Sequence, residues 1–228
     1  MAEIKIAGIE RLRMETDGEG VTTLVVSMGC PLRCAYCLNP FTWDNSYAGF
    51  KTYTVKGLYD ELKIDSLYFL STGGGIMFGG GEPLLNADFI REFIEEYKSV
   101  GWKFYMETSL SVPREKLDKV IDLIDCFVVD TKDMNKERYE KYTLGNYDLF
   151  YNNLTYLLEK VGCEKIIARV PKIPIFHKDN EFLENEQFLK DMGFENINVF
   201  DYINPEDHKK ISEAALKNRD SFIAKIIQ

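Results

Sequence analysis

Short apolar runs alternate with longer amphipathic stretches along this 228-residue chain. The short runs are rich in β-branched residues, which is typical of strands buried on both faces of a parallel sheet. The longer stretches repeat apolar residues every three or four positions, which is typical of one buried helix face. The predicted strands are Val21–Met28, Gly75–Gly79, Lys103–Glu107, Cys126–Asp130, Lys165–Val170 and Ile197–Phe200. The predicted helices are Thr54–Leu62, Ala87–Val100, Pro113–Ile124, Lys136–Tyr142, Asp148–Val161, Glu181–Met192 and Pro205–Ile227.

This alternation predicts a parallel sheet whose strands are joined by right-handed crossovers. Each strand–helix unit needs about 30 residues, and a closed eight-unit barrel takes about 250, so this chain is short for one. Six units fit. We therefore expect an α/β fold, an incomplete (βα)6 TIM-like barrel in a single domain, with its core at about 18–202 and a C-terminal helical region at 205–227. In such barrels the functional residues lie on the loops after the C-terminal strand ends.

The composition excludes several classes of protein. Hydrophobic residues make up 45% of the chain, enough to fill a core, so wholesale disorder is excluded. Asp and Glu outnumber Lys and Arg by 37 to 28; an acidic chain is not attracted to phosphate backbones, so we expect no nucleic-acid partner. Segment Met1–Glu10 carries charges and does not resemble a secretory signal, and no apolar run reaches the roughly 18 residues of a membrane span. We expect a cytoplasmic monomer that does not contact membranes.

Three of the five cysteines, Cys30, Cys34 and Cys37, form a C-x3-C-x2-C segment. An odd total without a secretory signal argues against a disulfide framework. Thiolates so close together repel one another unless a cation lies between them, which indicates metal binding. Three thiolates can bind three irons of a [4Fe–4S] cluster, whose full complement is four cysteines, and the open fourth iron favours catalysis. We interpret Cys126 and Cys163 as small buried hydrophobic residues.

Zinc binding and thiol redox chemistry are the alternatives for this cysteine segment. A structural zinc site needs four ligands, commonly in two separated pairs. The two histidines, His177 and His208, lie far along the chain, and neither falls in a ligand pair. The residues therefore favour an iron–sulfur cluster, while the spacing alone leaves both alternatives open.

Glycines and polar residues follow the other predicted strands. Gly80, Gly81 and Glu82 come after the second strand, where glycines permit a ligand to approach closely and a carboxylate can accept a hydrogen bond from an ammonium group. A plain glycine-rich turn is the alternative there. For Lys132 and Arg169 the alternative is an ordinary surface ion pair. The candidates from the later strands are Glu107, Thr108, Asp130, Thr131, Lys132 and Arg169.

Taken together, these motifs resemble the radical S-adenosylmethionine (SAM) superfamily. Its hallmark is the C-x3-C-x2-C spacing with an aromatic residue before the last cysteine, here Tyr36, and Gly80–Pro83 is similar to its GGEP motif. Within the superfamily, the chain is most similar to the activating enzymes of glycyl-radical enzymes, the pyruvate formate-lyase activating type. This similarity runs from about 18 to 202 and rests on Met28–Asn39, Thr42–Asp44, Gly73–Ile76, Glu107–Ser109, Asp130–Asn135 and Arg169–Pro174.

The resemblance implies a cofactor role for the first two motifs. Residue Tyr36 would lie near the adenine of SAM. The cluster ligands would be Cys30, Cys34 and Cys37. The contacts of the methionyl amine would be Gly80, Gly81 and Glu82.

The resemblance also implies roles for the later motifs. Lys132 and Arg169 would contact the carboxylate of SAM, an interaction to which the guanidinium fork is suited, and Lys132 joins the three cysteines as a catalytic residue. A monovalent cation would lie near Glu107 and Asp130. The positions close to SAM or to this cation would be Glu107, Thr108, Asp130 and Thr131.

The reaction and its partners follow from the same resemblance. An electron from a flavodoxin or a ferredoxin, passed through the cluster, would cleave SAM and release a 5′-deoxyadenosyl radical. That radical would abstract a hydrogen atom from a glycine Cα of a partner glycyl-radical enzyme. The alternatives are an enzyme of the same scaffold acting on another peptide or on a small molecule, a non-catalytic iron–sulfur electron carrier, and a zinc-stabilised binding module.

Four positions depart from the pattern of the resembled family. Thr22 stands where the family has the arginine of a D-G-P-G-x-R motif, and Leu38 stands where it has a histidine. Leu110 replaces a glycine, and Ile203 replaces the histidine of a Pro-Tyr-His stretch. The last of these lies where a partner's glycine loop would enter, so it bears on the substrate more than on the cofactors.

Overall fold

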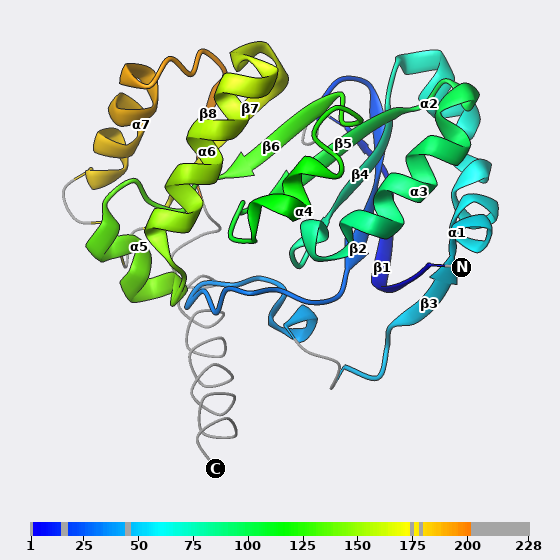
Figure 1. Cartoon of the computed structure of the whole chain (residues 1–228), viewed down its shortest axis with the longest axis horizontal. Helices are drawn as coiled ribbons and strands as arrows, with labels where there is room; N and C mark the ends of the chain where they lie inside the picture. Colours follow the sequence, from blue (N-terminus) through cyan, green and yellow to red (C-terminus); the bar gives the residue numbers. More distant parts are fainter. Residues whose placement is uncertain (1, 15–17, 44–46, 174–175, 178–179, 202–228) are drawn as a thin grey trace.

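A single sheet organises this computed structural model, which describes residues 2–14, 18–43, 47–173, 176–177 and 180–201. In that part of the chain, eight strands pair in the order β3-β1-β2-β4-β5-β6-β7-β8 (Figure 1). The sheet is open, with β3 and β8 at its edges, so the incomplete (βα)6 barrel is confirmed. Its parallel strands are β2 (Val21–Ser27), β4 (Gly75–Gly80), β5 (Lys103–Thr108), β6 (Cys126–Asp130), β7 (Ile166–Lys172) and β8 (Ile197–Asp201).

Two further strands extend the sheet on the β2 side, and the apolar pattern did not predict them. β1 (Glu3–Met14) pairs antiparallel with β2, and β3 (Lys51–Thr54) pairs antiparallel with β1. After Ile6, every residue of β1 is at least partly exposed. A strand that buries only Ile4 and Ile6 lacks the long apolar run that marks the parallel strands, which explains why β1 was missed.

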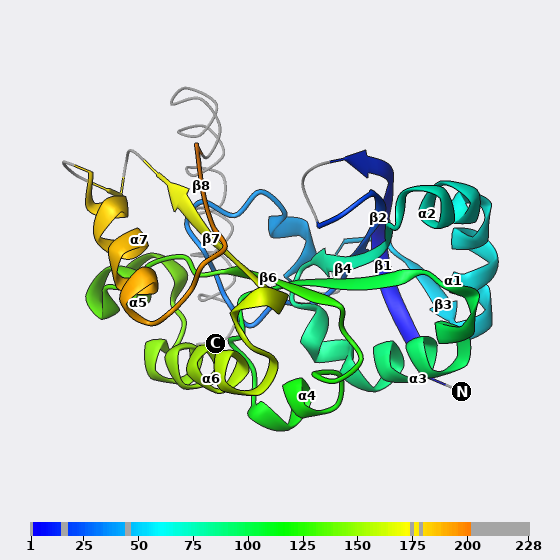
Figure 2. The ribbon, with the colours of Figure 1, turned by 90° about the horizontal axis from the view of Figure 1, so that it is seen from above.

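Seven helices accompany the described strands, and α3, α4 and α6 lie along one side of the sheet (Figure 2). The cysteine segment lies on the other side. The α-helices are α1 (Val55–Leu62), α2 (Ser66–Thr72), α3 (Ala87–Tyr97), α4 (Arg114–Asp118), α5 (Lys136–Thr143), α6 (Tyr147–Val161) and α7 (Glu181–Asp191). Single 3-10 turns occupy Pro40–Thr42, Lys63–Asp65, Pro83–Asn86, Lys98–Val100 and Cys163–Lys165.

Two helical predictions were inaccurate. Helix α4 ends at Asp118 instead of Ile124, and the turns that follow it bury Val120 and Ile121, so the apolar spacing alone did not mark where the helix ends. Helix α2 was missed because Leu67 and Leu70 are 75% and 54% exposed, so its pattern has no core-facing stripe. The predicted helix at 205–227 lies outside the described residues.

Three apolar clusters form the interior of the described residues, and one of the two smaller clusters contains part of the cysteine segment. The largest lies between sheet and helices, and a second lines the inner face of the sheet, with Leu24, Met77 and Tyr105 among its members. The third joins residues of the cysteine segment to α5 and to the end of β7: Leu32, Cys34, Ala35, Tyr36, Tyr142 and Ile173. None of the helices that the structure describes is both long enough and apolar enough to cross a membrane.

Candidate active site

A cavity of about 480 Å³ lies at the C-terminal ends of the parallel strands and is lined by most of the predicted site residues. The cysteine segment contributes Cys30, Cys34, Tyr36 and Cys37. The strands and their following loops contribute Gly80, Gly81, Glu107, Thr108, Asp130, Lys132 and Arg169. Of the predicted residues, Glu82 and Thr131 do not line it. The sheet thus gathers at one place side chains that lie far apart in the sequence.

Helix α5 holds the cysteine segment through main-chain hydrogen bonds. The Arg33 amide donates to the Thr143 carbonyl and the Ala35 amide donates to the Tyr142 carbonyl, both at 2.8 Å. The Tyr36 ring packs edge-on against the Tyr142 ring, with 5.2 Å between centroids. These contacts fix the segment between its first and last cysteines.

The three thiols, of which Cys34 is buried and Cys30 and Cys37 are partly exposed, lie in an environment that disfavours their charged forms. Burial, reinforced by the carboxylate of Glu82, raises the pKa of Cys30 to about 12. Burial also raises the pKa of Cys34 far above its usual range and raises the pKa of Cys37. Because thiolates are the ligand form, such thiols need a bound cation to ionise together. The donor set therefore fits an iron–sulfur cluster.

The arrangement of the thiols does not form a site for a single ion. In the described ranges, no three His, Cys, Asp or Glu side chains lie close enough together to hold one metal ion. In a [4Fe–4S] cluster each thiolate binds a different iron, so its ligands need not converge on one point. Cys126 and Cys163 are partly exposed, not buried as predicted, and they are not among the residues that line the cavity.

The two glycines of the GGEP segment permit a close approach of main chains. A Cβ at Gly80 would lie 2.4 Å from Val26 Cγ1, and a Cβ at Gly81 would lie 2.2 Å from the Gly29 carbonyl oxygen. The Gly81 amide donates to the Ser27 carbonyl at 3.0 Å. These glycines therefore let the end of β4 pack directly against the start of the cysteine segment.

The carboxylate of Glu82 is bonded within the protein. It is fully buried, and it accepts hydrogen bonds from Thr108 Oγ1 at 2.7 Å, from Ser109 Oγ at 2.6 Å and from the Ser109 amide at 2.9 Å. Burial raises its pKa, although these hydrogen bonds oppose the shift. The side chain thus ties the end of β4 to the end of β5, and its contact with the methionyl amine stays a prediction.

Both candidate cations line the cavity and are held by carboxylates. Arg169 Nη1 donates to Glu107 Oε1 at 2.8 Å, and Lys132 pairs with Asp130. The Lys132 side chain is only 14% exposed, its backbone has φ +60°, and its Nζ lies 5.8 Å from the centre of the Tyr36 ring. These pairs are partly buried in the cavity wall, unlike the surface ion pair considered from the sequence.

Thr131 lies behind the cavity wall. Its Oγ1 donates to the Arg169 carbonyl at 2.9 Å, and the residue is fully buried. It therefore joins the loop after β6 to β7, and its predicted place beside SAM or a cation is not tested.

Five charged or aromatic residues of the cavity, among them Trp43, were not predicted from the sequence as site residues. Glu10 and Arg13 reach it from β1 and form an ion pair at 3.2 Å, while Phe200 and Asp201 reach it from β8. The register places Glu10 opposite Leu24, and that pairing is not readable from the chain. Phe200 lies at the end of the predicted strand Ile197–Phe200, but its place in the cavity was not predicted.

A model of the radical SAM superfamily matches residues 24–215, which is most of the chain. The protein therefore belongs to the radical SAM superfamily. It is 32% identical to the (2S)-3-sulfopropanediol dehydratase activating enzyme of Klebsiella oxytoca, over 82% of this chain and 78% of that one. It is 28% identical to the pyruvate formate-lyase 1-activating enzyme of Escherichia coli K12, over 86% of this chain and 80% of that one.

Solved structures share the fold at lower identity. Streptococcus suis SuiB bound to S-adenosylmethionine superposes with a TM-score of 0.62 at 15% identity, over 90% of this chain and 46% of SuiB. The chain thus spans less than half of that structure. Membership of the superfamily confirms the predicted superfamily and the predicted cofactors, a [4Fe–4S] cluster and SAM.

Proposed function

We propose that this protein is an activating enzyme that abstracts a hydrogen atom from a glycine Cα of a partner glycyl-radical enzyme. The observation that carries the proposal is one cavity in which the three cysteines of a single segment face the polar ends of β5, β6 and β7. The named activating enzymes, which match about four-fifths of this chain and of their own length, support the choice of substrate.

Each part of the cavity has a task in this proposal. When bound, the cluster and SAM together supply the radical chemistry. Cys30, Cys34 and Cys37 hold the cluster. Lys132 and Arg169 bind the carboxylate of SAM. An electron donor of the flavodoxin or ferredoxin kind completes the reaction.

One observation favours a second candidate, an enzyme of the same scaffold acting on another peptide or on a small molecule. Leu38 lines the cavity and is 44% exposed, at a position where the resembled family has histidine. An apolar side chain there presents a different surface to the substrate. This candidate predicts the same SAM cleavage with a different acceptor of the radical.

The test is anaerobic incubation of the reconstituted protein with SAM, a reductant and a candidate glycyl-radical protein from the same organism. We expect 5′-deoxyadenosine and a glycine-centred EPR doublet on that partner. Cys34→Ala should abolish both products, because one iron loses its ligand. Cys126→Ala, a partly exposed cysteine outside the cavity, is the matched control and should retain both.

Two results would contradict the proposal. If 5′-deoxyadenosine forms only when another peptide or a small molecule is added, the second candidate is correct. If Cys34→Ala still cleaves SAM, the assignment of the cysteine segment is wrong.

A further inference from the structure

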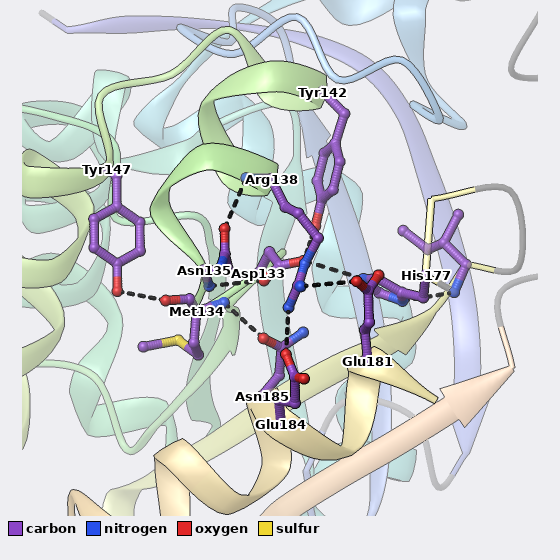
Figure 3. A network of polar contacts seen from close by, with 11 residues as sticks. Asp133, Met134, Asn135, Arg138, Tyr142, Tyr147, His177, Glu181, Glu184 and Asn185 are labelled. Atoms are coloured by element: carbon purple, nitrogen blue, oxygen red, sulfur yellow. Dashed lines mark hydrogen bonds and ion pairs between the residues drawn. The ribbon is translucent and has the colours of Figure 1, made fainter. Parts of the chain in front are cut away.

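A buried carboxylate beside the cavity joins three parts of the chain. Asp133 follows Lys132 directly, and its side chain is fully buried. Its Oδ2 accepts hydrogen bonds from Arg138 Nε at 2.9 Å and from the Tyr142 hydroxyl at 3.1 Å, and it lies 3.2 Å from His177 Nε2 (Figure 3). The loop after β6, helix α5 and the segment after β7 therefore meet at one side chain.

The histidine in this network uses both ring nitrogens within the protein. His177 Nδ1 accepts a hydrogen bond from the Ile173 amide at 3.2 Å, so the ring proton lies on Nε2 and is donated to Asp133. The side chain is 2% exposed. This arrangement makes His177 a structural bridge.

Helix α7 completes the network on its outer side. Arg138 forms ion pairs with Glu181 at 3.2 Å and with Glu184 at 3.1 Å. Asn185 Oδ1 accepts a hydrogen bond from the Met134 amide at 2.9 Å (Figure 3). Although burial opposes its ionisation, the bonds from His177 and Arg138 hold the pKa of Asp133 below its usual value. The carboxylate is thus a charged centre with several donors.

The network affects the cavity through the two segments that it holds, helix α5 and the chain at Lys132. Tyr142 supplies the carbonyl that accepts the Ala35 amide and the ring that packs on Tyr36. On the other side, Asp133 follows Lys132 directly in the chain, and the backbone of Lys132 is in the left-handed conformation. Asp133, Arg138, Tyr142 and His177 are not among the residues that line the cavity.

We propose that Asp133 is a positioning residue that holds the cysteine segment and Lys132 in place relative to each other. It acts through Tyr142 on one side and through the chain at Lys132 on the other. This inference rests on the proposed function, in which the cysteine segment holds the cluster and Lys132 binds SAM. Charge and hydrogen-bonding capacity, not contact with a ligand, are what Asp133 contributes.

The first experiment needs no cofactor. In the full-length chain without its cluster, Asp133→Asn should let iodoacetamide alkylate Cys34 about tenfold faster, because the segment is no longer held by α5. Mass spectrometry of the same sample gives the rate at Cys126, which should not change. The matched control is Asp118→Asn, since Asp118 accepts a hydrogen bond from the Tyr156 hydroxyl at 2.8 Å on an exposed surface.

Two outcomes would overturn the inference. An unchanged rate at Cys34 would show that the carboxylate does not hold the segment. A parallel acceleration at Cys34 and Cys126 would show general loosening of the fold instead of a local release.

The second experiment uses the cluster-loaded protein. Asp133→Asn should weaken SAM binding about tenfold at an iron content equal to that of the wild type, because Lys132 is displaced. Tyr142→Phe keeps the ring and removes only the bond to Asp133, so it should have a smaller effect on SAM affinity. Wild-type affinity in Asp133→Asn would contradict the inference. If the wild type itself binds no SAM, the proposed function fails, and the alkylation result still decides whether Asp133 holds the segment.

Discussion

Leu110 shows how one residue can combine conformational strain with burial. Its φ is +55°, and the residue is fully buried. Its carbonyl accepts a hydrogen bond from Asn153 Nδ2 at 2.8 Å, which fixes the turn after β5. A left-handed conformation costs an L-residue about 1–2 kcal/mol, and the resembled family commonly has glycine here. Burial of the leucine side chain offsets that cost.

This balance predicts an unusual order of stability among variants. Leu110→Ala loses the buried side chain and keeps the strain, so the free energy of unfolding should fall by about 2–5 kcal/mol. Leu110→Gly loses the same burial but relieves the strain, and it should be about 1 kcal/mol more stable than the alanine variant. Urea unfolding of the cluster-free protein measures both values.

The control for this prediction is Leu117, which is also fully buried but lies in helix α4. There the alanine variant should be the more stable of the two, because glycine weakens a helix. If alanine were also preferred at 110, strain would not explain the turn.

At the scale of elements, the end of β4 sets the position of the cysteine segment. Gly81 lies against the Gly29 carbonyl so closely that a Cβ would stand 2.2 Å from its oxygen. Because the obstructing atom belongs to the main chain, a side chain can be accommodated only if one of the two segments moves.

Gly81→Ala should therefore reduce the iron bound per chain several-fold after anaerobic reconstitution. Gly73→Ala is the matched control: Gly73 has φ +74°, but a Cβ there would meet no atom within 4 Å. It should cost about 1 kcal/mol of stability and leave the iron content unchanged. Equal iron content in the two variants would show that the close approach does not position the segment.

The predictability of the elements depended on which faces they bury. Strands β2 and β4 were predicted because nearly all of their positions are buried, whereas β1 has partly or fully exposed positions along most of its length. Since β1 was missed, so were Glu10 and Arg13, which it brings to the cavity. The sequence predicted Glu82 as a site residue but not its hydrogen-bond partners. Whether Thr108 comes within hydrogen-bonding distance of Glu82 depends on how β4 and β5 are aligned.

At the scale of the whole molecule, the cavity exists only in the folded chain. Its lining comes from strands at both sides of the open sheet, from β1 through to β8. A ligand of this cavity therefore binds the native state and not the unfolded chain, and it must stabilise the fold by mass action.

We expect SAM at 100 times its dissociation constant to stabilise the cluster-loaded protein by about 2.7 kcal/mol. For a chain of this size, the melting temperature should rise by about 5–10 °C. At the same SAM concentration, Lys132→Ala should show a smaller rise, while Lys136→Ala, whose ammonium pairs with Asp148 on the surface, should match the wild type. An equal rise in both variants would remove Lys132 from the SAM site.

The hydrogen bonds from the cysteine segment to α5 have a consequence for the order of events during synthesis. Arg33 and Ala35 leave the ribosome early, but the carbonyls that hold them belong to Thr143 and Tyr142, and the network behind those carbonyls extends to His177. Until α5 has been made, the three thiols lie on a segment that lacks these two hydrogen bonds. The binding place for the cluster is therefore completed only when most of the protein has been translated, and loading with iron and sulfide must follow folding.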